Sequence, residues 1–256
     1  MLPVYALEFP PIGEILNWPD IAFEGTPYGF NKIAIITLVS AGLTLLLFFL
    51  GAKKQMVPRG LQNLMEISVE FIRKEVIMPT IGPDGMRYTP LMLALFFFIF
   101  FSNIFGIIPA VQMPATARMA IPAMLTLIVY VLFIAVGFKH QGVGGYLKST
   151  LFPPGVPKPI YILVTPIEFV SVFLVRPFSL AVRLFANLLA GHILLVTFAV
   201  LTAALWAKAW YVIFLPFPFI MLTMMTGFEL LVAFLQAYIF SILAGVYIGG
   251  SLHPEH

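Results

Sequence analysis

Two very long apolar runs fill the second half of the sequence and restrict the chain to a membrane fold. Residues 160–205 and 211–249 are almost continuously apolar, and as helices at ~1.5 Å per residue they would be about 70 Å and about 60 Å long. Both lengths are about twice the ~30 Å hydrocarbon layer of a bilayer. Each run therefore either divides into two upright spans or forms one steeply tilted helix. We favour two tilted helices in a hairpin, because the prolines in the runs, such as Pro166 and Pro177, could kink a helix without ending it.

Composition excludes several classes of protein. Of the 256 residues, 61% are hydrophobic and 10% are charged, whereas a soluble domain is about half apolar and about a quarter charged. The bases do not cluster with aromatic residues, which argues against nucleic-acid binding. The chain has no cysteine, so disulfides, thiolate metal sites and cysteine nucleophiles are excluded. We expect neither a metal nor a cofactor.

The first half of the chain predicts three further spans and their orientation. Residues 31–51 contain an uncharged stretch long enough for a first membrane helix, and 90–139 predict a membrane helical hairpin. The segment 1–30 is acidic and has no Lys or Arg, whereas bases follow the first span and gather in 139–158. The positive-inside rule therefore places 1–30 outside the cytoplasm and the basic loops, including a flexible one at 139–158, inside.

The segment 61–79 differs from the spans because charged residues interrupt it. Its apolar and small residues recur at helical spacing, which is typical of an amphipathic helix on a membrane surface. They are Leu61, Leu64, Met65, Ser68, Val69 and Ile72. A helix that packs on a soluble partner is the alternative.

A few charges lie inside the two long apolar runs. The first run contains Glu168, Arg176, Arg183 and His192, and the only acidic or basic residue of the second is Glu229. A charge at the centre of a span costs about 2.5–3.5 kcal/mol even on a mild insertion scale. Such residues either face an aqueous cavity or a partner, or form a structural ion pair between helices.

Helical spacing separates these charges by chemistry. Polar and small residues at spacings of three, four and seven form one stripe with Arg183 at its centre. The stripe consists of Arg176, Ser179, Leu180, Arg183, Asn187 and Ala190. His192 is nine positions from Arg183, about two and a half turns, so it faces roughly the opposite side. Arg keeps its proton at biological pH, whereas His and Glu can exchange protons. A fixed cation flanked by proton carriers suits a device that admits protons without letting them pass directly.

Three motifs in order carry a resemblance to a known family. They are PFSLAVRLFANLLAGHILL at 177–195, SNIFGIIP at 102–109 and FELLVAFLQAYIFS at 228–241. Together with the order of apolar segments, they resemble subunit a of F-type (rotary) ATP synthases, in a bacterial style, over essentially the whole chain.

The resemblance implies roles for single residues. Arg183 stands where the family has its indispensable arginine, and His192 and Glu229 stand where the family carries a proton-exchanging pair. Glu168 is one residue further from Pro177 than the acid that the family associates with its inner half-channel. The remaining polar positions of the implied proton path are Asn103, Ser179, Asn187 and Gln236.

The resemblance also implies a mechanism and partners. The chain would form two offset half-channels that load and unload protons on a c-ring, beside b-type peripheral stalk subunits, as one copy per complex. It would not be an enzyme by itself, since the sequence has no nucleotide-binding motif. Its location would be a bacterial plasma membrane, or alternatively a mitochondrial inner membrane.

Two other functions compete with this interpretation. A secondary transporter or proton-coupled channel acting alone would also need membrane charges, but it predicts internal repeats and a substrate pocket at broken helices. The two long runs do not resemble each other residue for residue. A structural membrane anchor is the second alternative, and it leaves the stripe around Arg183 unexplained.

Overall fold

The computed structural model of the chain is helical, and no strand occurs in the residues that it describes. These are residues 31–52, 60–108, 111, 114–152, 157–206 and 211–252. Five of the helices in these ranges are long and apolar enough to cross a membrane. The expected all-α membrane fold is confirmed. The predictions for segment 1–30 and for the basic loop between the first two helices fall outside the described residues.

Helix α2 (Lys32–Gly51) begins at a side-chain cap. The Asn31 carboxamide oxygen accepts hydrogen bonds from the backbone N–H groups of Ile33 and Ala34, at 3.1 and 3.2 Å. Further along, the hydroxyl of Ser40 donates to the carbonyl four residues earlier, at 2.8 Å. An apolar helix can therefore hold hydroxyl side chains without leaving them unsatisfied.

The predicted amphipathic segment is a helical run in three parts: α3 (Leu61–Phe71), the π-helix η1 (Ile72–Ile77) and the short α4 (Met78–Thr80). Its apolar face differs from the predicted one. Met65 and Ile72 are buried as expected, but Leu61 and Leu64 are 45% and 48% exposed. These two leucines are left for lipid or a partner.

Two π-helices arise from the same local cause. In η1 and in η5 (Ser171–Val175), a proline follows the end of the π segment by two residues, Pro79 and Pro177 respectively. Proline clashes with the carbonyl four residues earlier, so the regular backbone hydrogen bonds of an α-helix cannot continue through it. In both runs the residue before the proline donates to the carbonyl five residues back. The widened turn lets the helix pass the proline with a bend.

Two spans follow in the middle of the chain. A 3₁₀ turn, η2 (Pro83–Tyr88), leads into α5 (Thr89–Ile104), and a second, η3 (Ala115–Ala117), precedes α6 (Ala120–Leu151). Helix α6 therefore extends past residue 139, where the predicted membrane hairpin ends.

Helix α6 changes direction at Gly142, which has a φ of 73°. Beyond this point Tyr146 packs against Gly137, where a Cβ would collide with the tyrosine ring. We expected a flexible loop over 139–158 because of its glycines. That expectation is wrong as far as the end of α6, because the chain is helical on both sides of Gly142 and the tyrosine contact packs the second part against the first.

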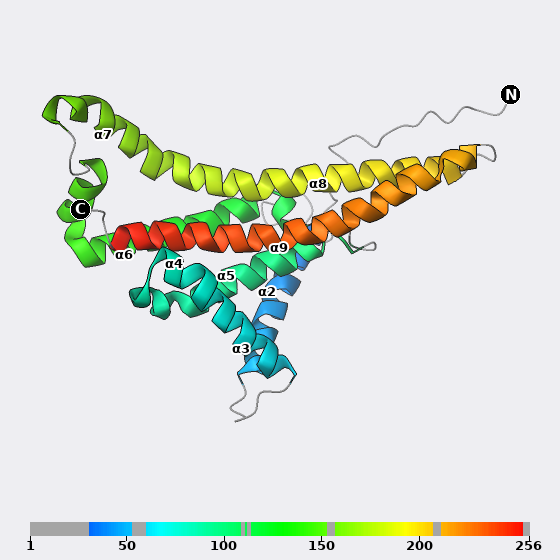
Figure 1. Ribbon diagram of the computed structural model, residues 1–256, viewed down its shortest axis with the longest axis horizontal. Coiled ribbons are helices and arrows are strands. Elements are labelled where there is room, and N and C mark those ends of the chain that lie inside the picture. Colours follow the sequence, from blue (N-terminus) through cyan, green and yellow to red (C-terminus); the bar gives the residue numbers. More distant parts are fainter. Residues whose placement is uncertain are drawn as a thin grey trace.

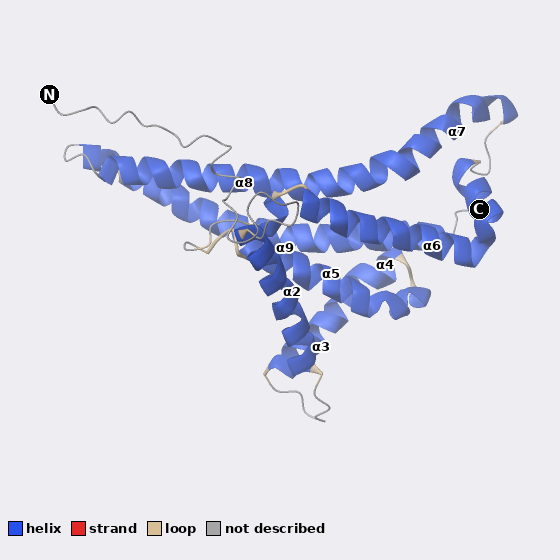
Figure 2. Cartoon of the chain, turned by 180° about the vertical axis from the view of Figure 1, so that it is seen from behind, coloured by secondary structure: helices blue, strands red, loops and turns tan. Residues whose placement is uncertain are grey.

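Helices α8 (Arg176–Trp206) and α9 (Pro216–Leu252) form the long hairpin. They lie side by side along the longest dimension of the molecule in Figure 1 and in the view from behind in Figure 2. Helix α7 (Tyr161–Val170) and η5 extend α8 backwards, so that Tyr161–Trp206 is one continuous helical run. The hairpin thus has two long helices, and its tilt in the bilayer stays a prediction.

Helix α9 is the centre of the packing and contacts α5, α6 and α8. Its inner face includes several small side chains, and Ala233, Ala237 and Ala244 are completely buried. At Gly249 a Cβ would meet the carbonyl oxygen of Thr80 in α4. Small residues allow helices to approach closely within a membrane, so α9 can sit between three neighbours.

Candidate functional site

Helix α8 separates the fixed cation from the titratable histidine. Leu184, Leu188 and His192 recur every four residues and are buried, with 1%, 1% and 5% of their surface exposed. Arg183 and Asn187 lie on the exposed face of the helix. The two residues that the sequence placed on opposite sides therefore lie on different faces, one inside the fold and one outside.

The exposed stripe around Arg183 is narrower than predicted. Leu180 is only 2% exposed and belongs to the core, whereas Asn187 and Ala190 are exposed with Arg183. Ser179 is half-buried. Leu180 lies about 60° around the helix from Arg183, at the edge between the faces, and the packing of the hairpin draws it inward.

The Arg183 side chain faces away from the rest of the chain. Among the described residues it takes part in no ion pair. Its neighbours on the exposed face include Ala186 and Ala190. An unpaired guanidinium beside such small apolar side chains is unfavourable in lipid. The face therefore suits an anionic group presented by a partner in the membrane.

Glu229 of α9 lies against the backbone of α8. It is 6% exposed, and a Cβ added to Gly191 would collide with its carboxylate oxygen Oε1. Gly191 immediately precedes His192 in α8. The structure thus brings the Glu229 carboxylate to the helix turn that carries the histidine.

A cavity of about 380 Å³ opens beside this contact. His192 supplies a polar group to its wall, and Thr226 of α9, three residues before Glu229, supplies a hydroxyl. Gly106 and Ile107, which follow α5, close another side, and apolar residues of α8 together with Leu222 of α9 complete the lining. A space of this volume can hold several water molecules.

Asn103 sits near the end of α5, three residues before the cavity wall begins, and it is 1% exposed. Its Oδ1 accepts a hydrogen bond from the hydroxyl of Thr116 at 2.6 Å. Its Nδ2 and the hydroxyl of Ser102 have no hydrogen-bond partner in the described protein. Buried polar atoms almost always have partners, ordered water included. This end of α5 is therefore a polar, hydratable site.

The other two predicted residues lie apart from the histidine. Gln236 is 5% exposed on α9, two turns from Glu229 and on the same face. Glu168 is half-buried on α7, at ~1.5 Å per residue about 36 Å along the helical run from His192. The structure therefore groups His192 with Glu229 and leaves Glu168 at the other end of the hairpin. In the described part of the chain, no group of three acidic, histidine or cysteine side chains could hold a metal ion.

Sequence reasoning missed three residues near these positions. Gly191 is part of a recognised motif, and its place beside His192 was the available signal. Thr116 lies in a connecting segment without periodicity, so nothing marked it. The ring of Tyr247 lies 5.7 Å from the guanidinium carbon of Arg176, a cation–π distance that depends on how α8 and α9 pair.

These features define a class of protein. The chain is a multi-pass helical membrane protein whose long hairpin presents a fixed cation outward and holds titratable groups beside an internal cavity. A family model described as the ATP synthase A chain matches residues 34–249, and the chain belongs to this family.

Bacterial relatives are similar to the chain over most of their length. The ATP synthase subunit a of Frankia alni is 41% identical over 248 residues, which is 94% of this chain and 84% of the relative. The subunit a of Rhodopseudomonas palustris is 41% identical over 248 residues, 96% of this chain and 94% of the relative. That of Hyphomonas neptunium is 35% identical over 256 residues and 99% of each chain. The chain is accordingly a membrane subunit of an F-type ATP synthase.

Proposed function

We propose that this chain is the proton-conducting stator subunit, with two offset half-channels that load and unload protons on a c-ring. The observation that carries the proposal is that α8 places its fixed cation and its titratable histidine on opposite faces. Arg183 is exposed on one face, while His192 is buried on the other, beside the cavity and the turn that Glu229 contacts. A path for protons and a barrier to their direct passage are thus parts of one helix.

The cavity beside His192 supports an outer half-channel. The His192 imidazole and the neighbouring Glu229 carboxylate can each accept and release a proton. Protons would pass through hydrated space near Asn103 and these two groups to a carboxylate of the c-ring. Each proton that crosses 100 mV supplies about 2.3 kcal/mol, so a direct leak would waste the energy that turns the ring.

Arg183 would hold the ionised ring carboxylate between the half-channels. Its guanidinium stays charged, and its exposed position with small neighbours such as Ala186 and Ala190 lets another helix approach. Glu168 and Ser179 would border the inner half-channel, and Asn187 and Gln236 would complete the polar path.

The remaining parts of the proposal are partners and orientation. A c-ring would cover the exposed face of α8, and b-type stalk subunits would complete the stator, with one copy of this chain per complex. The chain would lie in a bacterial plasma membrane with its N-terminus outside. A transporter acting alone would have to leave Arg183 facing lipid, which is costly.

The decisive experiment is Arg183→Ala in the assembled complex, with Arg87→Ala as control, because Arg87 is also exposed but lies before α5. Membrane vesicles would be tested for ATP-driven acidification and passive proton permeability. We expect Arg183→Ala to abolish pumping and raise the passive leak, and Arg87→Ala to do neither. Tight vesicles that pump at the wild-type rate with Arg183→Ala would contradict the proposal.

A further inference from the structure

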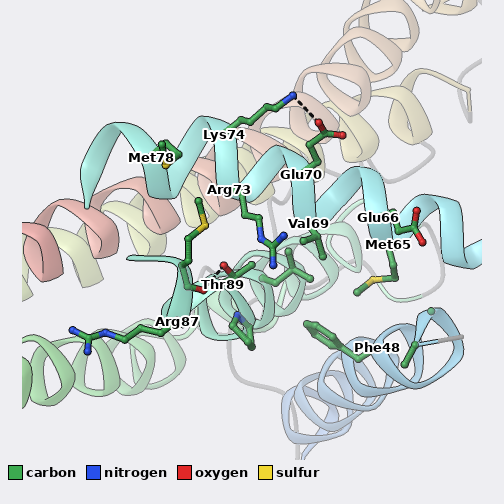
Figure 3. A pocket seen from close by; sticks show the side chains of 15 residues that line it. Phe48, Met65, Glu66, Val69, Glu70, Arg73, Lys74, Met78, Arg87 and Thr89 are labelled. Carbon is green, nitrogen blue, oxygen red and sulfur yellow. Dashed lines mark hydrogen bonds and ion pairs between the residues drawn. The ribbon is translucent and has the colours of Figure 1, made fainter. Parts of the chain in front are cut away.

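A second and larger cavity lies far from the histidine, between α2, α3 and the start of α5. Its volume is about 970 Å³. Phe48 of α2 and Leu93 of α5 provide apolar walls, and Met65 and Val69 of α3 provide another (Figure 3). The proposed proton path uses none of these residues.

The cavity lies at the edge of the apolar spans. Helix α2 ends at Gly51 and α5 begins at Thr89, and both residues line the cavity. The run from α3 to η1 passes these two helix ends and carries charged side chains. A cavity at the ends of two candidate spans faces the headgroup region of the bilayer, while its apolar walls continue toward the acyl chains.

Some charged side chains on the cavity wall have an ion-pair or hydrogen-bond partner, and others do not. Lys74 forms an ion pair with Glu70 at 2.6 Å, and this hydrogen bond and charge hold the pKa of the Glu70 carboxyl below its usual value. Glu66 accepts a hydrogen bond from Gln62 at 3.0 Å. Arg73 has no ion pair among the described residues. Arg87 also has no ion pair there, but its guanidinium carbon lies 4.9 Å from the centre of the Tyr88 ring. Arg73 is therefore the guanidinium on the wall that remains available to an external anion.

The directions of the side chains separate Arg73 from its neighbour. In Figure 3 the Arg73 guanidinium extends from η1 toward Thr89, across the space above the apolar wall. Lys74 and Glu70 meet on the other side of the same helix, and Arg87 extends away. The local sequence adds bases, since Lys53, Lys54 and Arg59 lie between α2 and α3.

We propose that this cavity binds an anionic phospholipid from the leaflet that borders α3. Arg73 would donate paired hydrogen bonds to the phosphate oxygens, a geometry that guanidinium suits. The first acyl carbons would cover Phe48, Met65 and Leu93. An anionic headgroup is favoured over a neutral one because Arg73 extends into this space without an ion pair among the described residues, and bases at a membrane surface attract anionic lipids.

A bound lipid would also fasten α3 to α2. These helices meet where a Cβ on Gly51 would collide with Met65, and beyond that contact the cavity separates them. The lipid would replace water in this space with apolar contacts on both helices.

The test uses the purified, assembled complex and compares substitutions of two adjacent basic residues, Arg73 and Lys74. Arg73→Gln and Lys74→Gln each remove one positive charge from the same helix, so a general attraction of anionic lipid changes equally. Each complex would be delipidated and exchanged into mixtures of phosphatidylglycerol and phosphatidylcholine, and the retained lipid would be measured by native mass spectrometry. We expect Arg73→Gln to lower phosphatidylglycerol retention about tenfold, as for loss of a charge-assisted hydrogen bond, and Lys74→Gln to lower it far less, because Lys74 is paired with Glu70.

Two further arms keep the result decisive. Val69→Phe, which adds volume on the cavity wall without changing charge, should also lower retention and serves if Arg73→Gln fails to assemble. The wild-type complex should retain phosphatidylglycerol over phosphatidylcholine, and soluble glycerol 3-phosphate should not displace it. Equal retention of the two lipids by the wild type overturns the proposal. So does loss of another subunit from Arg73→Gln with phosphatidylglycerol retention unchanged, since the cavity would then hold a protein partner.

Discussion

The carboxyl group of Glu229 in α9 packs on Gly191 in α8 so closely that no side chain fits between them. This contact brings the acid to the turn that holds His192, and it uses the smallest residue of that turn. The pairing of the two long helices at this point determines where the titratable groups of the site meet.

The first prediction concerns Gly191. Gly191→Ala should displace the Glu229 carboxylate and lower ATP-driven proton pumping about tenfold or more, since small displacements of a reacting group are costly. The control is Gly227→Ala, because a Cβ there meets no atom within 4 Å. Pumping in vesicles and the size of the detergent-extracted complex would be measured. Equal pumping by the two variants would show that the contact has no role in proton transfer.

The second prediction concerns the charge of Glu229. Glu229→Gln keeps the shape of the side chain but removes its ability to exchange a proton. We expect slower ATP-driven acidification with normal assembly. Glu75→Gln, a change of the same kind at an exposed position of η1, should pump normally. Wild-type rates from Glu229→Gln would remove this residue from the proton path.

The third prediction distinguishes a separating arginine from a structural one. Arg183→Lys keeps a positive charge, so a structural role predicts a moderate loss. A lysine desolvated beside a carboxylate can lose its proton and take part in proton transfer. We therefore expect Arg183→Lys to abolish coupled ATP synthesis in a complex of normal size. Synthesis at half the wild-type rate or more would favour the structural role.

The fourth prediction tests orientation. The chain has no cysteine, so a single introduced cysteine reports without background. Gly144→Cys and Ile213→Cys are both at exposed positions, in the last part of α6 and in the 3₁₀ turn before α9, η6 (Tyr211–Phe214). An impermeant reagent should reach Gly144→Cys from the cytoplasmic side and Ile213→Cys from the outside. The reverse pattern would invert the proposed topology.

Local features of the sequence determined the helical elements. Apolar runs without breaks predict long membrane helices, because a backbone in lipid must satisfy its own hydrogen bonds. The opposition of Arg183 and His192 was also predictable, since nine positions along a helix fix the angle between two side chains. These properties depend only on the period of the helix, so the sequence of one segment is enough to predict them.

Tertiary contacts overrode local signals in two places. The glycines after 139 predicted a loop, but the chain is helical on both sides of a break at Gly142, and Tyr146 packs on Gly137. Gly costs about 1 kcal/mol in a helix relative to Ala, which one buried aromatic contact can offset. Leu180 belonged by spacing to the exposed stripe, and the packing of α8 draws it into the core.

Only the folded chain decided which residues from different helices meet. Three features each join different segments of the chain: the contact of Glu229 with Gly191, the hydrogen bond from Thr116 to Asn103 and the cavity beneath Arg73. The offset between two packed helices is set by the fit of all their side chains, and no single segment contains that information. The sequence by itself therefore determined the helices, their faces and the charged residues they carry, whereas the tertiary structure decided which of those residues form a site.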